Sequence, residues 1–179
     1  GTDLIQQLRT MTGMGMMDCK KALEESGGDV TKAVEILRKK GLAVATKRGG
    51  NLTQQGLVHS YIHPGSRIGV LLELNCETDF VARTDEFKQL AQDICMHIAA
   101  IKPLFIKPEH IDAAFLEKEK EIIAAQLKTE GKPASIVEKI MQGKLQKLHS
   151  DVCLLHQPFV KDNKRTVDEI IKDLMGKVG

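Results

Sequence analysis

The sequence of 179 residues is poor in aromatic side chains, with one Tyr, five Phe and no Trp. Proteins that bind single-stranded nucleic acid stack its bases on aromatic rings, so a platform of that kind is poorly supplied. The formal net charge is only +2, which does not favour the strong, salt-dependent attraction to phosphates that nucleic-acid binding requires. Composition therefore argues against nucleic acid as the main partner.

Cysteines are few and scattered. Cys19, Cys76, Cys95 and Cys153 form no C-x-x-C pair and have no matching His spacing, so the sequence predicts neither a zinc site nor a disulfide framework. No apolar run approaches the roughly 18 residues of a membrane span, and the first residues lack a signal-peptide pattern. We therefore expect a soluble intracellular protein with reduced, buried thiols.

The clearest change of hydrophobic period lies on either side of residues 75–83. Before them, apolar residues alternate along residues 68–74, which predicts a half-buried strand. After them, apolar residues recur at three- and four-residue steps along residues 87–98, which predicts an amphipathic helix with Thr84 as its N-cap. Residues 75–83 must then turn at the surface.

This turn contains Asp79-Phe80-Val81, for which two interpretations are open. In the first, Phe80 and Val81 fill the corner between strand and helix while Asp79 helps to cap the helix, because large apolar side chains in connections normally fold into the core. In the second, Phe80 is displayed to enter a partner.

Three short helices are predicted in residues 1–41. Asp29 caps the third and Gly41 ends it. Only one of the adjacent Met16 and Met17 can easily face inward. The other should be exposed, which would suit an adaptable binding surface.

Beyond the bundle, residues 42–55 have little periodicity and are interpreted as a linker. Residues 57–62 and 68–74 are predicted to form a hairpin, with Pro64-Gly65 in a type II turn. Residues 102–110 fit an edge strand or the approach to one.

The last part of the chain is predicted to be mainly helical. Residues 112–128 and the segment opened by Pro133 should form an antiparallel helical hairpin. Gly143 in its second helix predicts close packing, because glycine there costs about 1 kcal/mol relative to alanine. A capping box from Thr166 to Glu169 opens a final helix.

No catalytic constellation is found in the sequence. It contains no Gly-rich phosphate loop followed by a lysine, no nucleophile elbow and no recognisable carboxylate pair. His149 and His156 lie near Cys153, but their spacing fits neither a catalytic triad nor a metal signature. We therefore expect a binding protein rather than an enzyme, with no metal or cofactor. The basic cluster in residues 38–48 is interpreted as a complement to a helix dipole and a solvated linker, with an RNA contact as the alternative.

The nine residues NCETDFVAR closely resemble the signature of the elongation factor Ts family, the guanine nucleotide exchange factors for elongation factor Tu. Other segments resemble the family in the right order, so that the resemblance covers nearly the full chain: TGMGMMDCKKALEESGGDVTKAVEILRKKG, SYIHPGSRIGVLLELNCETDFVAR and KPLFIKPEH. The first of these also resembles a ubiquitin-associated-type domain. The fold class expected is therefore α+β, with a three-helix ubiquitin-associated-like domain in residues 1–41, a linker in 42–55 and, in 56–179, an antiparallel-sheet core packed with helices.

The resemblance implies a set of residues that contact elongation factor Tu. They are Arg9, Met16, Met17, Lys20, Arg48, His63, Thr78, Asp79, Phe80, Val81 and Val160. It further implies that Asp79 and Phe80 enter the partner close to its magnesium and phosphate site and thereby promote GDP release. Two alternatives are a ubiquitin-associated-type adaptor whose core merely dimerises, and an RNA-binding module that uses residues 38–48.

The chain also departs from the family pattern. After residues 176–179, family members continue with a basic, apolar strand that completes the core sheet, which implies that this strand is missing here. Long members contain two related core halves, whereas this chain combines features of both in one. It thus resembles the short form, in which two chains act together as a homodimer. We expect it in the bacterial cytoplasm, with an organellar matrix or stroma as the alternative.

Overall fold

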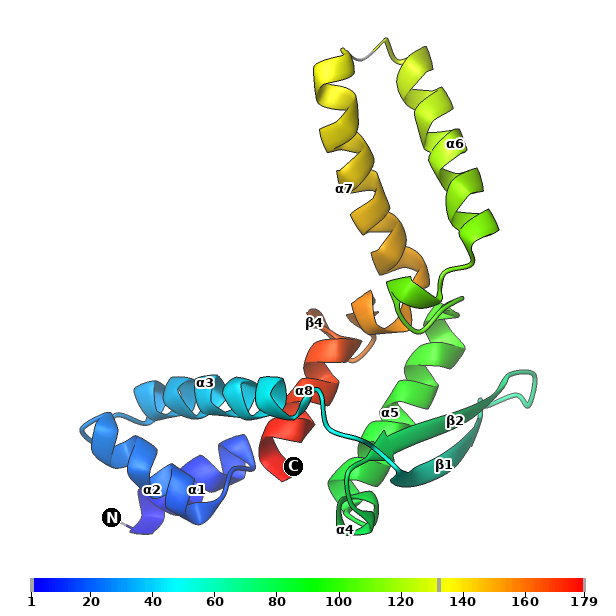
Figure 1. Ribbon diagram of the computed structural model, residues 1–179. Coiled ribbons are helices and arrows are strands. Elements are labelled where there is room, and N and C mark those ends of the chain that lie inside the picture. Colours follow the sequence, from blue (N-terminus) through cyan, green and yellow to red (C-terminus); the bar gives the residue numbers. More distant parts are fainter. Residues whose placement is uncertain (1, 132, 179) are drawn as a thin grey trace. The chain divides into compact units, whose positions relative to one another are not determined.

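The computed structural model describes residues 2–131 and 133–178 (Figure 1). Helices dominate it, and each of its two small sheets has two strands, β1 with β2 and β3 with β4. The α+β class is therefore confirmed. The elements in chain order are α1 (Thr2–Thr12), α2 (Met16–Glu25), α3 (Val30–Arg48), β1 (Gln55–Ile62), β2 (Gly69–Cys76), α4 (Asp79–Ala82), α5 (Asp85–Ile101), η1 (Pro108–His110), α6 (Ala113–Thr129), α7 (Ala134–Val152), η2 (Leu154–His156), β3 (Pro158–Phe159), β4 (Asp162–Thr166) and α8 (Val167–Val178).

The chain divides into two compact units. The first unit comprises residues up to 60 together with 71–93 and the segment from 169 onward, and the second comprises 61–70 and 94–168. Within the described ranges, no helix combines the length and the apolar character that a membrane span requires. All four cysteines are free and buried, as the sequence predicts.

Helices α1 to α3 pack around a small core of their own. Its buried members are Leu8, Met14, Cys19, Ala22, Leu23, Ala33 and Leu37. The Asp29 side chain caps α3 by accepting a hydrogen bond from the Lys32 amide at 3.1 Å. The expectation that Met16 or Met17 faces inward is wrong, since their side chains are 51% and 63% exposed. Later residues of α2 supply its buried face, and Met14 fills the core ahead of the helix.

Gly41 does not end α3, which continues to Arg48. A Cβ atom on Gly176 of α8 would lie 2.6 Å from the carbonyl oxygen of Gly41. Gly176 therefore allows the backbone of α8 to approach that of α3 closely, whereas a Cβ atom on Gly41 would lie an ordinary 3.9 Å from the Gly176 Cα. Only residues 49–54 of the expected linker lie outside helices and strands. The division into domains at residues 41 and 55 stays a prediction.

The β1–β2 hairpin forms where the sequence predicts it. The Ser66 amide donates to the His63 carbonyl at 3.0 Å, and Gly65 has φ of +93°, as a type II turn requires. Burial alternates along β2. On the exposed face of the hairpin, Val58 and Leu71 are 66% and 77% exposed.

Helices α6 and α7 form the predicted helical hairpin (Figure 1). Close packing at Gly143 is wrong, because a Cβ there would have no neighbouring atom within 4 Å. Residues 102–110 do not form a regular strand: Phe105 makes an isolated parallel bridge to Cys153, and a 3-10 turn follows. Their interpretation as the approach to a strand is the closer one.

Candidate functional site

A four-residue helix, α4, connects β2 to α5 (Figure 1). The Thr78 hydroxyl accepts a hydrogen bond from the Val81 amide at 3.4 Å, so Thr78 is the N-cap of α4. The Thr84 hydroxyl accepts from the Phe87 amide at 3.3 Å, which confirms Thr84 as the cap of α5. Asp79 does not act as a cap, because it is the first residue of α4, where its charge favours the helix dipole.

The two apolar side chains of α4 point in different directions. Phe80 is 78% exposed. Val81 is half-buried and packs against the core cluster of Cys76, Ala82 and Phe87. Successive residues of an α-helix are rotated by about 100°, so neighbouring side chains point in different directions. Each interpretation of the sequence therefore holds for one residue: Val81 fills the corner, and Phe80 is displayed.

Ionic contacts surround this turn. The Asp79 carboxylate pairs with Arg83 at 2.8 Å. Just before the turn, Glu77 pairs with Arg48 at 3.3 Å and accepts a hydrogen bond from the Asn51 amide group at 2.9 Å. The end of α3 is thus tied to the segment that carries α4.

The thiol of Cys76 also stabilises this turn through a hydrogen bond. Cys76 is 7% exposed, and its Sγ donates a hydrogen bond to the Thr78 carbonyl at 3.1 Å. Burial raises the pKa of the Cys76 thiol, so it stays protonated and keeps its role as donor near neutral pH. Because Thr78 is the cap of α4, this bond helps to fix where the short helix begins.

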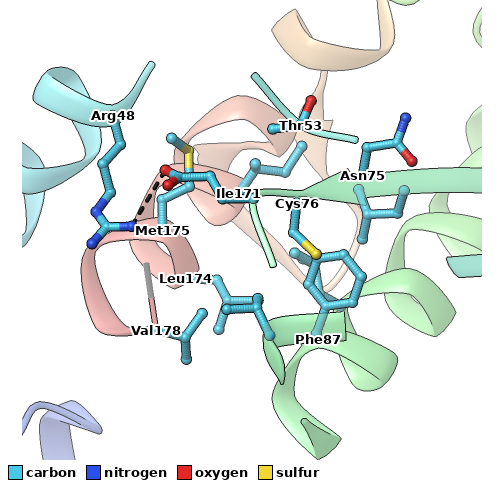
Figure 2. Close-up of a pocket in the computed structure, with 13 residues that line it drawn as sticks. Arg48, Thr53, Asn75, Cys76, Phe87, Ile171, Leu174, Met175 and Val178 are labelled. Carbon is cyan, nitrogen blue, oxygen red and sulfur yellow. Dashed lines mark hydrogen bonds and ion pairs between the residues drawn. The ribbon is translucent and has the colours of Figure 1, made fainter. Parts of the chain in front are cut away.

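A pocket of about 90 Å³ lies behind the turn, in the first unit. Leu74, Val81 and Phe87 contribute to its walls, together with residues of α8. Figure 2 shows Arg48 at one rim with its ion pair, and Leu174, Met175 and Val178 on the α8 side. The lining is mainly apolar, so the pocket fits a role in packing better than acid–base chemistry.

The other predicted contact residues are exposed or half-buried. Arg9 lies on α1, and Met16, Met17 and Lys20 share α2, where Lys20 pairs with Glu24 at 3.9 Å. In the second unit, His63 lies in the hairpin turn, where its Nδ1 is 2.9 Å from the Tyr61 hydroxyl. Val160 follows β3 and is 44% exposed.

The structure thus gathers part of the predicted set. Residues 78–81 form one turn, which Glu77 joins to Arg48. Sequence reasoning missed Glu77 and Asn51 as supports of this turn. The only available signal was that Glu77 lies inside the NCETDFVAR signature itself.

Comparisons with known proteins show which family the chain belongs to. The sequence pattern of the family described as Elongation factor TS matches residues 14–179. The Elongation factor Ts of Desulforamulus reducens is 54% identical over 176 residues, which cover 98% of this chain and 81% of the relative. That of Thermotoga petrophila is 55% identical over 177 residues, covering 99% and 88%. That of Carboxydothermus hydrogenoformans is 53% identical over 178 residues, covering 99% and 82%. The turn that displays Phe80 therefore lies in a chain that belongs to the elongation factor Ts family.

Proposed function

We propose that this chain is a guanine nucleotide exchange factor for elongation factor Tu in translation elongation, and that α4 carries the exchange activity. The observation that carries the proposal is the 78% exposure of Phe80, on a helix that Thr78 caps and Val81 fixes to the core. A large apolar side chain held outward by a rigid support is suited to entering a pocket of another protein.

In this mechanism, Phe80 wedges between structural elements of the partner and shifts those that hold its magnesium ion. Asp79 disturbs the polar network around that ion, and phosphate binding weakens. The Asp79–Arg83 pair is 46% and 75% exposed. Exposed pairs of this kind contribute about 0–1 kcal/mol, so Asp79 can change partners at little cost.

The size of the effect limits what Phe80 does alone. Burying one Phe contributes about 1.5–3 kcal/mol, and about 1.4 kcal/mol corresponds to a tenfold change in affinity. Phe80 therefore accounts for one or two decades. The remaining binding energy must come from wider surfaces, for which we propose Arg9, Met16, Met17, Lys20, Arg48, His63 and Val160.

The test is the release of fluorescent GDP from purified elongation factor Tu, with and without this protein. We expect faster release and, by thermodynamic reciprocity, a complex with nucleotide-free elongation factor Tu that GDP and magnesium dissolve. An unchanged release rate would contradict the proposal. A complex that survives saturating GDP and magnesium would favour a simple adaptor instead.

We also propose that the protein forms a homodimer in the cytoplasm through the exposed face of the hairpin, where Val58 and Leu71 lie open. Two such faces would bury these side chains against each other. Sedimentation of wild type and Leu71→Asp tests this, since the charged variant should shift the mass to that of a monomer. Equal masses would exclude the face as the interface.

A further inference from the structure

A buried polar network in the second unit joins α5 to the turn between β3 and β4. His97 is fully buried, and its Nε2 lies 2.9 Å from the Gln157 side-chain oxygen. The Val160 amide donates a hydrogen bond to His97 Nδ1 at 3.1 Å. The Gln157 amide nitrogen in turn donates to the Asp151 carbonyl at 2.9 Å. Each polar atom of the imidazole thus has one partner.

These contacts determine where the imidazole carries its proton. A backbone N–H can only donate, so the Nδ1 atom that faces Val160 must be an unprotonated acceptor. A neutral imidazole then carries its proton on Nε2, which donates to the Gln157 oxygen. The Gln157 nitrogen is directed away from His97 toward the Asp151 carbonyl, which agrees with this assignment.

The network holds a turn that carries a predicted partner contact. Phe159 stacks on the His97 ring, with centroids 6.0 Å apart and planes at 22°. Phe159 is 5% exposed, whereas the next residue, Val160, is 44% exposed. The ring therefore contacts one residue through its face and fixes the backbone of the next through Nδ1.

We infer that His97 is a positioning residue for partner binding: its imidazole holds the Val160 amide and thereby keeps the Val160 side chain directed outward. This inference rests on the proposed function, because it concerns the same partner surface. An apolar residue of similar size could fill the space but would leave the Val160 N–H and the Gln157 oxygen without their partners. A well-packed core alone does not require histidine at this position.

Two matched substitutions separate the two hydrogen bonds. In His97→Asn, the side-chain oxygen can occupy the place of Nδ1 and accept from Val160. In His97→Gln, the side-chain nitrogen can occupy the place of Nε2 and donate to Gln157 instead. Both remove the ring, so both should lower the thermal stability to a similar extent.

The readouts are hydrogen exchange of the Val160 amide and the rate of GDP release from elongation factor Tu. With His97→Gln, we expect the protection of this amide and the acceleration of release each to fall by up to about tenfold, the range of one net hydrogen bond. With His97→Asn, both should stay close to wild type. Equal effects of the two substitutions on Val160 protection or on GDP release would overturn the inference.

A measurement on the unmodified protein keeps the test decisive if the variants unfold. Nitrogen-15 spectra of the histidine side chains should show His97 as a neutral ring with its proton on Nε2. A proton on Nδ1 would overturn the inference, since that atom could not accept from Val160. If the wild type fails to accelerate GDP release, the proposed function fails, while the spectra and Val160 exchange still decide what His97 does.

Discussion

The dipeptide Phe-Val occurs in two turns of this protein and is oriented in opposite ways. In α4, Phe80 is 78% exposed and Val81 packs inward; at the end of β3, Phe159 is 5% exposed and the following Val160 is 44% exposed. The difference follows from the backbone and the neighbours of each pair. Val81 lies on the core side of a capped helical turn, whereas Phe159 lies in a strand and stacks on a buried imidazole. Hydrophobicity alone thus does not determine which residue a turn displays.

The largest expected difference between the two Phe residues is in their contribution to stability. Phe159→Ala should lower the free energy of unfolding by about 3–5 kcal/mol, because it opens a cavity beside His97. Phe80→Ala should change it by less than about 0.5 kcal/mol, as is usual for an exposed residue. Denaturant unfolding of both variants gives the two values. Similar losses would mean that the two rings do not differ in their structural role.

The second expected effect is on function, where Phe80→Ala should have the larger effect and Phe159 is not a predicted contact. Phe80→Ala should remove most of the acceleration of GDP release, in line with about 1.5–3 kcal/mol for one buried Phe, yet keep part of the affinity for elongation factor Tu. Stopped-flow release of fluorescent GDP measures the acceleration, and titration with elongation factor Tu measures the affinity. Leu104→Ala is a suitable control, since Leu104 is 63% exposed and is not a predicted contact. A fully active Phe80→Ala would show that the wedge assignment is wrong.

The third effect concerns the two valines. Val81→Ala should cost about 1 kcal/mol of stability, less than full burial of a Val contributes, because Val81 is half-buried and packs against the cluster of Cys76, Ala82 and Phe87. Val160→Ala should leave stability nearly unchanged and weaken partner binding modestly. Thermal unfolding and titration with elongation factor Tu check these outcomes. A larger loss of stability in Val160→Ala than in Val81→Ala would contradict the assignment of Val81 as the packed valine.

The smallest expected effect is a pH dependence. Burial lowers the pKa of His97 below the ordinary 6.5, so the unfolded chain binds this proton more readily than the folded one. Stability should be at its full value above pH 6.5 and should decline as the pH falls below it, until the folded state also binds the proton.

Unfolding measured from pH 7.5 downward tests this slope. This slope should become shallower in His97→Gln, which removes the titrating imidazole. A slope below pH 6.5 that is identical in wild type and His97→Gln would exclude His97 as its source.

Much of the fold could be predicted from periodicity and local signals. The β1–β2 hairpin, the Asp29 and Thr84 caps, and the helical hairpin of α6 and α7 all depend on short-range rules of the chain. The errors at Gly41 and Gly143 concern contacts between separate segments, which local patterns do not show, whereas those at Met16, Met17 and Asp79 are local. Gly41 matched a helix stop, but its partner Gly176 lies far along the chain.

The candidate site was predictable in its location but not in its geometry. The change of period placed a turn at residues 75–83, and the apolar pair left two orientations open. Which of Phe80 and Val81 faces outward depends on the four-residue helix and on packing against the core cluster that contains Phe87, neither of which follows from composition. The His97 network was invisible for the same reason: Gln157 is 60 residues away in the chain, and no spacing rule connects them.

The backbone contact between Gly41 and Gly176 has a consequence for natural variation. A single methyl group on Gly176 would lie 2.6 Å from the carbonyl oxygen of Gly41, closer than two such atoms can approach. Substitution of Gly176 is therefore not neutral, because the two helix backbones would have to shift. A lineage that replaces Gly176 must move α3 and α8 apart, so the absence of a side chain at this position preserves the spacing of the two helices.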